Sequence, residues 1–427
     1  MQIEVKATEG VHGRVELPSS KSISNRALVI NALSGNGQMP DNVSDCDDTN
    51  VMIKWLTDRQ SANRDGCVPP VIDIGAAGTA MRFSSALLAV VEGTFVITGT
   101  ERMKNRPISI LVDALRELGA EVEYVEKEGF PPLRITGNPR MKGGEISLPG
   151  SVSSQYISAL LMIAPMMKDG LRLVLTGDIV SRPYIDMTLG LMREYGAVAE
   201  WESGQRSIVV EHGAYEAMPY LVENDWSAAS YWYEMVALSQ NEDARVLLPG
   251  LFAQSMQGDS RGAEVFAMLG VATHFGEDDM VILCKNGECV NFLEYNFLQM
   301  PDLAQTFVVT CCMLGVPFHF TGLQSLKIKE TDRIEALKTE MAKLGFCLED
   351  RNDSELLWDG KRKAIDAERL AEVAIDTYED HRMAMAFAPV ALQLGSIRVN
   401  NPEVVSKSYP HYWDDLRSVG FQIHKTL

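Results

Sequence analysis

Cysteine and metal-binding patterns are scarce in this chain of 427 residues. The seven cysteines are an odd, scattered set without the spacing of a zinc site, so we expect reduced structural thiols rather than disulfides. No HExxH motif occurs among the seven histidines. These absences argue against a disulfide-stapled fold and against a bound metal.

Long apolar runs and an excess of basic charge are also missing. No apolar run approaches the roughly 18 residues of a membrane span, and the N-terminal MQIEVKATEGVHGRVELP lacks the profile of a signal peptide. We therefore expect a cytoplasmic protein that does not bind a membrane. A formal net charge of −19 argues against nucleic-acid binding and makes any local cluster of cations a candidate site for a small anion.

The chain does contain an internal repeat. Five helical patterns end in a glycine followed by a strand-like run, and the intervals between these glycines are 77, 74, 75 and 75 residues. The glycines are Gly119, Gly196, Gly270, Gly345 and Gly420. A second helical pattern begins near Ser20, Gly78, Ser153, Ser227, Asp302 and Asp380. Coincidental spacing is the alternative, but we expect an α/β fold of six βαβαββ units, three in each of two domains.

The stretch LKIKETDRIEALKTEMAKLG, residues 326–345, combines an amphipathic helix with cations at an unfavourable place. Thr331 or Asp332 could cap the helix start, and Asp332 with Glu335 resembles a capping box. Lys327 and Lys329 lie just ahead of that start, where the helix dipole disfavours positive charge. We expect Lys327 to be solvated and Lys329 to belong to an anion site.

The first helix of each unit begins with the most unusual residues. These turns combine Ser, Gly or Asp, which are ordinary helix caps, with Lys and Arg, which oppose the dipole. They read SSKSISNR, GAAGTAMR, GSVSSQY, NDWSAAS, MPDLAQT and TYEDHRM. Helix N-termini that converge with Arg and Ser would make a strong anion site. We therefore expect the ligand to be a phosphorylated and carboxylated small molecule.

Two carboxylates are candidates for proton transfer. Glu330 lies between Lys329 and Arg333, and Asp302 begins an otherwise apolar helix. Neighbouring cations lower the pKa of a carboxylate and burial raises it, so the sequence leaves the direction open. For Asp302, an ordinary helix cap is the alternative interpretation.

Seven segments resemble the 5-enolpyruvylshikimate-3-phosphate (EPSP) synthase family. They read LPSSKSISNRAL, GAAGTAMRF, RPISILVDALRELGAEV, GSVSSQYISALLM, SRPYIDMTL, IKETDRIEAL and TYEDHRMAMAF, in family order over nearly the whole chain. The resemblance implies a monomer with the two-domain enolpyruvyl transferase fold, an inside-out α/β barrel. It implies one domain of residues 18–224 and a discontinuous one of residues 1–17 and 225–427, with the active site in the cleft between them.

The resemblance also implies a reaction and its residues. Phosphoenolpyruvate would transfer its enolpyruvyl group to the 5-hydroxyl of shikimate 3-phosphate without metal or cofactor, and glyphosate would inhibit. Around phosphoenolpyruvate it places Lys21, Gly78, Arg106, Gln155, Lys329, Arg333, Arg382 and Lys407. Around shikimate 3-phosphate it places Lys21, Ser22, Arg26, Ser153, Ser154, Gln155, Ser181, Tyr184, Asp302, Ser325 and Lys329. Asp302 would be the base for the hydroxyl, and Glu330 and Lys21 would carry protons.

The chain departs from the family pattern at two positions. Ala76 stands where the family usually has Asn before its Ala-Gly-Thr, and Ser325 stands where it usually has Asn, four residues before Lys329. The first change removes an amide that would face phosphoenolpyruvate, and the second leaves room for a water. Because every charged position is retained, we interpret both as variation in an active enzyme.

Two other functions remain alternatives. A UDP-N-acetylglucosamine enolpyruvyl transferase would share the fold, but that enzyme uses a Lys-Asn pair and a reactive loop Cys. This chain has Lys21-Ser22 instead and no Cys between Cys67 and Cys284. A catalytically impaired, anion-binding paralogue is suggested by the two departures, whereas the two retained carboxylates argue against it.

Overall fold

The computed structural model describes residues 1–62 and 69–426, which form two compact units. Unit 1 comprises Met1–Pro18 and Glu223–Leu427, and unit 2 is the continuous segment Ser19–Val222. The sequence placed the two crossings near residues 17–20 and 222–225. Each unit buries its own hydrophobic cluster. Cys67, which entered the sequence argument, lies outside the described residues.

Five four-stranded sheets in the described chain share one topology. Each sheet holds one parallel and two antiparallel strand pairs, in the order first, second, fourth and third strand of a βαβαββ unit. The sheets of unit 2 contain β3 (Val71–Asp73), β4 (Gly93–Thr98), β6 (Leu133–Gly137) and β5 (Glu121–Tyr124), and β7 (Gly144–Pro149), β8 (Leu171–Thr176), β10 (Ser207–Val210) and β9 (Ala199–Trp201). The predicted α/β repeat is confirmed in these copies.

Two sheets of unit 1 follow the same order. They contain β12 (Leu269–Phe275), β13 (Met280–Cys289), β11 (Arg245–Pro249) and β2 (His12–Arg14), and β14 (Leu293–Asn296), β15 (Phe318–Thr321), β17 (Glu355–Trp358) and β16 (Glu349–Arg351). The parallel pair of the first of these sheets joins β2 to β11. This pairing ties an N-terminal strand to a unit that resumes more than 200 residues later.

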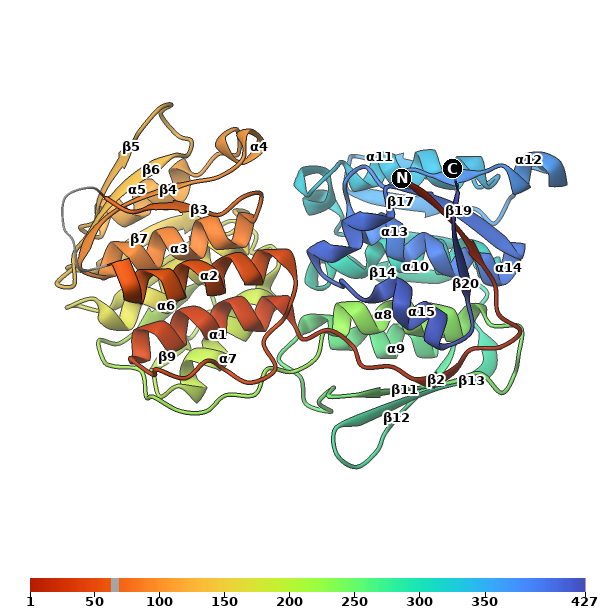
Figure 1. Ribbon diagram of the computed structural model, residues 1–427, viewed down its shortest axis with the longest axis horizontal. Coiled ribbons are helices and arrows are strands. Elements are labelled where there is room, and N and C mark those ends of the chain that lie inside the picture. The colour runs from red at the N-terminus through yellow and green to blue at the C-terminus, as the bar shows by residue number, and fades with distance from the viewer. Residues whose placement is uncertain (63–68, 427) are drawn as a thin grey trace. The chain divides into compact units, whose positions relative to one another are not determined.

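The last sheet of unit 1 is completed from the other end of the chain. It contains β18 (Ala374–Ile375), β19 (Ser396–Asn400), β1 (Gln2–Lys6) and β20 (Gln422–Thr426). Ile3 lies opposite Val399 on one side and Lys425 on the other, so the N-terminal strand is central. Both chain ends consequently lie in one sheet (Figure 1).

The first predicted copy of the repeat, which begins near Ser20, is the incomplete one. Its described residues form α1 (Lys21–Ser34) and α2 (Asp47–Ala62). A single isolated bridge joins Asp41 to Leu221 in place of a sheet. The two helices of this copy follow each other closely, since α1 ends at Ser34 and α2 begins at Asp47.

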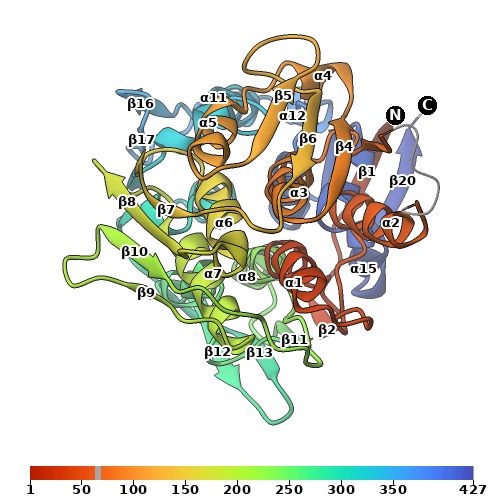
Figure 2. The same ribbon diagram turned by 90° about the vertical axis from the view of Figure 1, so that its left-hand side faces the viewer.

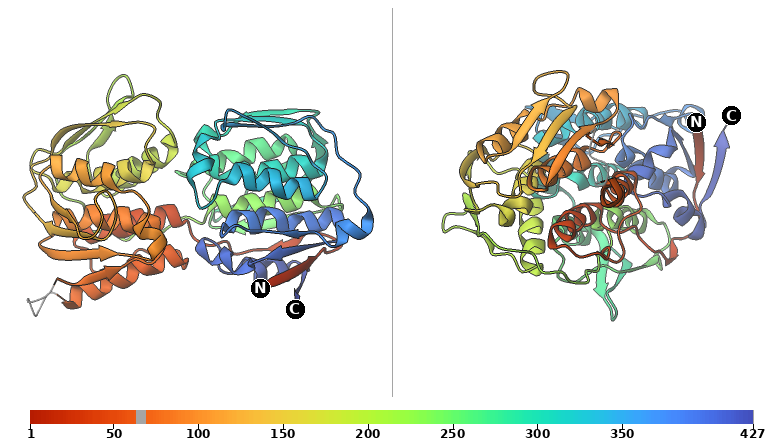
Figure 3. Two further views of the ribbon diagram at one scale, coloured as in Figure 1. Left: turned by 90° about the horizontal axis from the view of Figure 1, so that it is seen from above. Right: turned by 60° about the vertical axis from the view of Figure 1, so that its left-hand side comes forward.

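The helices that begin each repeat form the centre of each unit, with the strands outside them (Figures 2 and 3). In unit 2 these are α1, α3 (Gly78–Val90) and α6 (Ser154–Ile163), and in unit 1 they are α8 (Trp226–Leu238), α10 (Ala304–Leu314) and α13 (His381–Phe387). Every described residue of α8 is buried, as expected of a helix that is apolar on nearly all sides. The first turn of each central helix therefore gathers with its neighbours at one end of its unit.

The second helix of each repeat buries one face against its unit and leaves the other face exposed, as in α7 (Arg182–Glu194) and α11 (Arg333–Lys343). The other second helices and the smaller ones are α4 (Glu101–Lys104), α5 (Ser109–Glu117), α9 (Gly262–Ala267), α12 (Ala367–Ala371), α14 (Ala391–Leu394) and α15 (Tyr412–Ser418). Short 3-10 turns include η4 (Pro301–Leu303), η5 (Gln324–Ile328) and η7 (Pro402–Lys407). None of the helices in the described ranges is long and apolar enough to cross a membrane.

The repeat glycines end their helices at four of the five predicted places. Gly345 follows α11 with a φ of +90°, and the next amide, that of Phe346, donates to the carbonyl of Met341 at 3.0 Å. This is the left-handed C-terminal cap that glycine favours. Gly270 differs: it lies inside β12, at a shift in register with β13. The prediction that a helix ends there is wrong, because α9 stops earlier, at Ala267.

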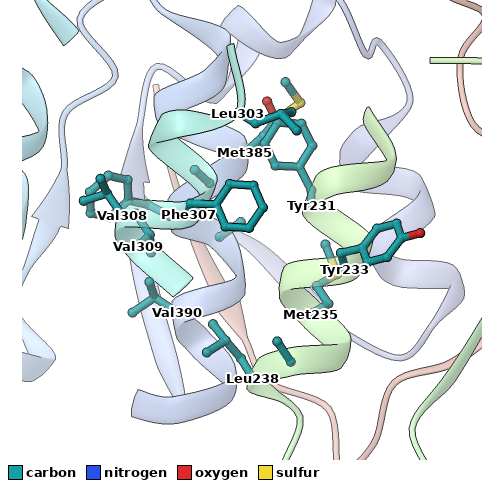
Figure 4. Packing of buried hydrophobic residues seen from close by; sticks show 14 of the residues in the cluster. Tyr231, Tyr233, Met235, Leu238, Leu303, Phe307, Val308, Val309, Met385 and Val390 are labelled. Atoms are coloured by element: carbon teal, nitrogen blue, oxygen red, sulfur yellow. The ribbon is translucent and has the colours of Figure 1, made fainter. Parts of the chain in front are cut away.

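Aromatic and branched side chains fill the space between α8, α10 and α13 in unit 1 (Figure 4). Phe307 of α10 packs against Phe266 with ring centroids 4.3 Å apart, and both rings are wholly buried. Truncating such a ring to alanine costs about 3–5 kcal/mol. This contact holds α9 against the N-terminal part of α10.

Candidate active site

Arg333, the first residue of α11, binds three carboxylates at once in unit 1. Its Nη1 donates to Oδ1 of Asp302 at 2.9 Å, and its Nη2 donates to Oε2 of Glu330 at 2.8 Å. Its Nε donates to Oδ2 of Asp380 at 2.6 Å. Burial lowers the pKa of Arg333, but the three carboxylates outweigh burial and raise it above its ordinary range. The guanidinium stays charged and fixes the positions of all three acids.

Asp302 lies among three cations. Besides Arg333, its carboxylate contacts Nζ of Lys329 at 3.3 Å and Nη2 of Arg382 at 3.2 Å. Its side chain is 13% exposed. The residue that precedes α10 as its cap is Leu303, and Asp302 lies in the 3-10 turn before it. The alternative interpretation of Asp302 as an ordinary helix cap is therefore wrong.

Lys407 contacts the residue next to Asp380, whereas Ser325 makes no side-chain hydrogen bond to the described residues around Asp302. Nζ of Lys407, at the end of η7, donates to the carbonyl of Glu379 at 2.7 Å, and Glu379 is followed directly by Asp380. Oγ of Ser325, in η5, is buried and makes no hydrogen bond with the described residues. The predicted anion site of unit 1 therefore contains the charged residues, and no side-chain hydrogen bond in the described chain links Ser325 to them.

Lys327 is the cation whose environment the sequence misjudged. Its Nζ lies 2.7 Å from Asp353 and 3.2 Å from Asp332, so the expectation of a solvated side chain is wrong. The hydrogen bond that Nζ of Lys327 donates to Asp353 is the main reason that the pKa of Lys327 is raised. Asp332 is also the N-cap of α11 and accepts from the amide of Glu335 at 3.1 Å, which confirms the predicted cap.

Asp259 is a buried acid that the sequence did not single out. It follows a short loop after β11 and accepts a hydrogen bond from Oγ of Ser227 in the first turn of α8. Burial, and then the charge of Asp302, raise the pKa of Asp259 to about 7, with Arg382 opposing them. Asp259 therefore changes protonation near neutral pH beside the cluster around Asp302.

In unit 2, Arg26 lies 2% exposed in a pocket of neutral groups. Its Nε donates to Oγ1 of Thr188 at 2.7 Å, its Nη2 to Oγ of Ser158 at 3.1 Å, and its Nη1 to the carbonyl of Ser22 at 2.7 Å. The ring of Tyr184 lies under the guanidinium, 5.9 Å from its centre. Burial lowers the pKa of Arg26 to about 10. A buried cation whose hydrogen-bond partners in the described parts of the chain are neutral is well suited to an anionic ligand.

The first turns of α3 and α6 meet beside two more arginines. Nε2 of Gln155 donates to Oγ1 of Thr79 at 3.0 Å. A Cβ added at Gly78 would lie 2.7 Å from Nη1 of Arg82 and 2.7 Å from Nη1 of Arg106. A larger residue here would require both guanidinium groups to shift, so glycine lets two cations lie against this helix start.

The remaining predicted residues of unit 2 stand at helix starts. Lys21 begins α1, and its Nζ lies 3.6 Å from Oδ2 of Asp48. Ser153 is the N-cap of α6, and the buried Ser154 is its first residue. Ser181 precedes α7 with a φ of +57°, in the left-handed region. These positions match the expectation that helix N-termini carry the unusual residues.

The predicted residues are divided between the two units, and in unit 1 the charged ones contact one another. Unit 1 brings together Asp302, Lys329, Glu330, Arg333, Arg382 and Lys407. Unit 2 contributes Lys21, Ser22, Arg26, Gly78, Arg106, Ser153, Ser154, Gln155, Ser181 and Tyr184. In the parts of the chain that the structure covers, no group of three His, Cys, Asp or Glu side chains could hold a metal ion.

The sequence argument did not assign two residues that bind predicted site residues, Asp380 and Thr188. Asp380 was visible only as a helix-start residue, although it binds Arg333 from the far side of the cluster. Thr188 lies one helical turn after Tyr184, and that spacing is the signal that could have pointed to its contact with Arg26.

Comparison with known proteins shows which family this chain is part of. The model of the family described as "EPSP synthase (3-phosphoshikimate 1-carboxyvinyltransferase)" matches residues 5–416. A 3-phosphoshikimate 1-carboxyvinyltransferase of Bacteroides fragilis is 60% identical over 423 residues, which cover 99% of either chain. The chain belongs to the EPSP synthase family. The sequence-based prediction of the family is thereby confirmed.

More distant members of the EPSP synthase family agree in length and fold. A 3-phosphoshikimate 1-carboxyvinyltransferase of Vibrio cholerae is 36% identical over 431 residues, covering 96% of this chain and 98% of that one. An EPSP synthase structure from Acinetobacter baumannii superposes with a TM-score of 0.79 at 20% identity, covering 99% of this chain and 100% of that one. The family is one of transferases of the shikimate pathway, which leads to aromatic amino acids.

Proposed function

We propose that this chain transfers the enolpyruvyl group of phosphoenolpyruvate to the 5-hydroxyl of shikimate 3-phosphate, giving EPSP and phosphate. Membership of the EPSP synthase family supports the reaction. The observation that carries the chemistry is the pair of carboxylates, Asp302 and Glu330, bound side by side to the buried Arg333. Two acids held at fixed positions among cations are what an addition followed by an elimination requires.

The addition joins the two substrates. The 5-hydroxyl oxygen bonds to C2 of phosphoenolpyruvate and gives its proton to Asp302, while C3 gains a proton and becomes a methyl group. Glu330 delivers that proton, and Lys21 is the second candidate carrier. The tetrahedral intermediate still carries the phosphate group, whose charge the neighbouring cations offset.

The elimination reverses the proton movement at carbon. C3 returns its proton to Glu330, the bond between C2 and the phosphate oxygen breaks, and phosphate leaves with the electron pair and takes up the proton that Asp302 accepted. Arg333 keeps Glu330 within reach of the same carbon in both steps, because its Nη2 holds the carboxylate. No metal or organic cofactor takes part in this sequence of steps.

We assign one set of residues to the binding of each anionic substrate, and some residues belong to both sets. Lys21, Gly78, Arg106, Gln155, Lys329, Arg333, Arg382 and Lys407 bind phosphoenolpyruvate. Lys21, Ser22, Arg26, Ser153, Ser154, Gln155, Ser181, Tyr184, Asp302, Ser325 and Lys329 bind shikimate 3-phosphate. The neutral pocket around Arg26 supports its part, because a buried arginine held by hydroxyls keeps its charge for a ligand. In this proposal glyphosate competes with phosphoenolpyruvate for the same site. That the protein is a monomer and that it is cytoplasmic both stay predictions.

A phosphate-release assay tests this function. Phosphate should appear only when shikimate 3-phosphate and phosphoenolpyruvate are both present, and omission of either should abolish it. Tight binding of both substrates without release would instead support the catalytically impaired paralogue. Release that requires a UDP-amino sugar in place of shikimate 3-phosphate would support the other enolpyruvyl transferase.

A further inference from the structure

A strained turn lies behind the cations of unit 1. The amide of Asp380 donates to the carbonyl of Thr377 at 2.8 Å, which closes a four-residue turn. Its two central residues, Tyr378 and Glu379, have φ angles of +53° and +57°. Turns with positive φ at both centres favour Asn and Gly, and a tyrosine is out of place in that region. Contacts outside the turn must hold this conformation.

The buried Glu340 of α11 supplies such contacts. Its carboxylate is fully shielded from solvent. Oε1 accepts a hydrogen bond from the hydroxyl of Tyr378 at 2.6 Å, and Oε2 accepts from the amide of Asp376 at 3.1 Å. Nζ of Lys343 lies 2.7 Å from the same Oε2. The carboxylate of Glu340 therefore accepts one hydrogen bond from a residue of the turn and one from the residue just before the turn.

The turn in its left-handed conformation contacts two cations of the candidate site through their charged groups and the backbone amide of a third, Arg382. Asp380 binds the guanidinium of Arg333, and its Oδ1 accepts from the amide of Arg382 at 2.9 Å. The carbonyl of Glu379 accepts from Nζ of Lys407 at 2.7 Å. A change in the backbone of this turn would move all three contacts together.

We propose that Glu340 and Tyr378 are positioning residues for phosphoenolpyruvate binding. They hold the turn Thr377–Asp380 in its left-handed conformation. The turn, through its own contacts, in turn positions Arg333, Arg382 and Lys407 around one anion. The inference rests on the proposed function for the identity of that anion. Neither residue acts on the reacting atoms, because each works through the backbone of the turn.

A simple structural role for Glu340 is the competing explanation, since it also pairs with Lys343. Tyr378→Phe separates the two roles, because it removes only the hydroxyl that meets Glu340 and leaves the Glu340–Lys343 pair intact. Tyr233→Phe is the matched control: its hydroxyl lies 2.9 Å from Oγ1 of Thr273, in the same unit. Glu335→Gln is the control for Glu340→Gln, since Glu335 forms an exposed pair with Lys338 on the same helix.

Steady-state kinetics gives the first readout. Loss of a charge-assisted hydrogen bond should lower kcat/KM for phosphoenolpyruvate about tenfold or more in Tyr378→Phe and in Glu340→Gln. The KM for shikimate 3-phosphate and the urea midpoint should stay close to those of the matched controls. Equal losses for both substrates, or no loss, would overturn the proposal.

Rescue by glycine gives the second readout. Glycine adopts positive φ without strain, so Glu379→Gly should restore most of the activity that Tyr378→Phe loses. The substitution keeps the carbonyl that Lys407 contacts. A double variant no better than Tyr378→Phe alone would show that the turn is not what the hydroxyl supports.

Amide hydrogen exchange reads the turn without any substrate. The amide of Asp380 should exchange faster in Tyr378→Phe than in the wild type or Tyr233→Phe, because its bond to Thr377 opens more often. Unchanged exchange would refute the positioning role even in an active enzyme. A wild-type protein that releases no phosphate would refute the proposed function instead, so the two failures are distinguishable.

Discussion

Arg333 illustrates how much of the candidate chemistry depends on one side chain. Its guanidinium is 1% exposed and partners Asp380, whose side chain is 0% exposed. Removing one member of a buried ion pair costs about 3–5 kcal/mol, because the other charge is left without compensation. A variant at Arg333 would confuse folding with catalysis. The acids that it holds are the better places to test mechanism.

Glu330→Gln should lower turnover by about two orders of magnitude or more while leaving KM nearly unchanged. The amide oxygen can still accept from Arg333, so the site keeps its geometry, but the side chain no longer exchanges a proton with C3. Initial rates of phosphate release measure the effect. Glu335→Gln, an exposed change two helical positions beyond Arg333, is the control. A rate equal to the control would remove Glu330 from the mechanism.

Gly78→Ala should raise the KM for phosphoenolpyruvate about tenfold or more and weaken inhibition by glyphosate, because the new methyl group forces two arginines aside. The added Cβ would lie 2.7 Å from Nη1 of Arg82 and of Arg106. Gly37→Ala is the control in the same unit, since its Cβ would meet nothing within 4 Å. An unchanged KM would show that the GTAMR turn does not face the substrate.

Asp259→Asn should flatten the pH dependence of stability. The pKa of Asp259 is raised to about 7 by burial, so the folded state keeps a proton that the unfolded state loses above about pH 4. Its contribution is fully present below pH 4 and is lost as pH rises toward 7, by up to about 4 kcal/mol. Urea unfolding of wild type and variant at several pH values measures it. Parallel curves would contradict the assignment.

The sequence predicted most of the charged residues because their motifs are local. Glu330, Lys329 and Arg333 stand within one short segment, and their proximity follows from the start of a helix. The partner Asp353 of Lys327 was missed because it comes after α11 in the sequence, in a turn where its φ is positive. Glu340 carried a signal that went unused: it is a carboxylate on the buried face of α11, beside Leu337 and Met341.

At the level of elements, α11 shows how a helix presents a catalytic side chain. Its N-cap, Asp332, satisfies the amide of Glu335, and the next residue is Arg333. The capping residue therefore fixes the direction in which the guanidinium leaves the helix. The spacing between Asp332 and Glu335 predicted this cap, whereas the central helices were predicted by their apolar patterns.

Asp332→Ala should destabilise unit 1 by about 1 kcal/mol and lower turnover, because the first turn of α11 loses its cap. The urea midpoint and the rate of phosphate release measure the two effects. Asp366→Ala is the matched control, since Asp366 precedes α12 without a side-chain capping bond. Equal changes in both variants would contradict the role of the cap.

Element boundaries were harder to predict where the tertiary structure intervenes. Gly270 has the spacing of a helix cap, yet it lies in β12, where a shift in register with β13 uses its positive φ. A local pattern cannot separate these uses, because a strand irregularity and a helix end favour the same glycine.

At the scale of the whole molecule, chain order and spatial order diverge in unit 1. The strand β1 lies between β19 and β20, and β2 pairs with β11, so the first 18 residues complete two sheets. Such long-range pairings leave no local trace in the sequence. Only the family resemblance indicated that this domain is discontinuous.

A fragment of residues 19–222 should fold alone, because unit 2 is continuous and has its own core. Residues 223–427 should remain without fixed tertiary structure until a peptide of residues 1–18 is added, since one sheet then lacks its central strand. Circular dichroism and cooperative urea unfolding measure both outcomes. A stably folded 223–427 fragment without the peptide would contradict the part assigned to β1.

The most direct test of the central claim is the identity of the product made from both substrates. Mass spectrometry of the reaction should show an enolpyruvyl ether at the 5-hydroxyl of shikimate 3-phosphate, formed in equal amount with released phosphate. Phosphate without the ether, or substrates left unchanged by folded protein, would contradict the account.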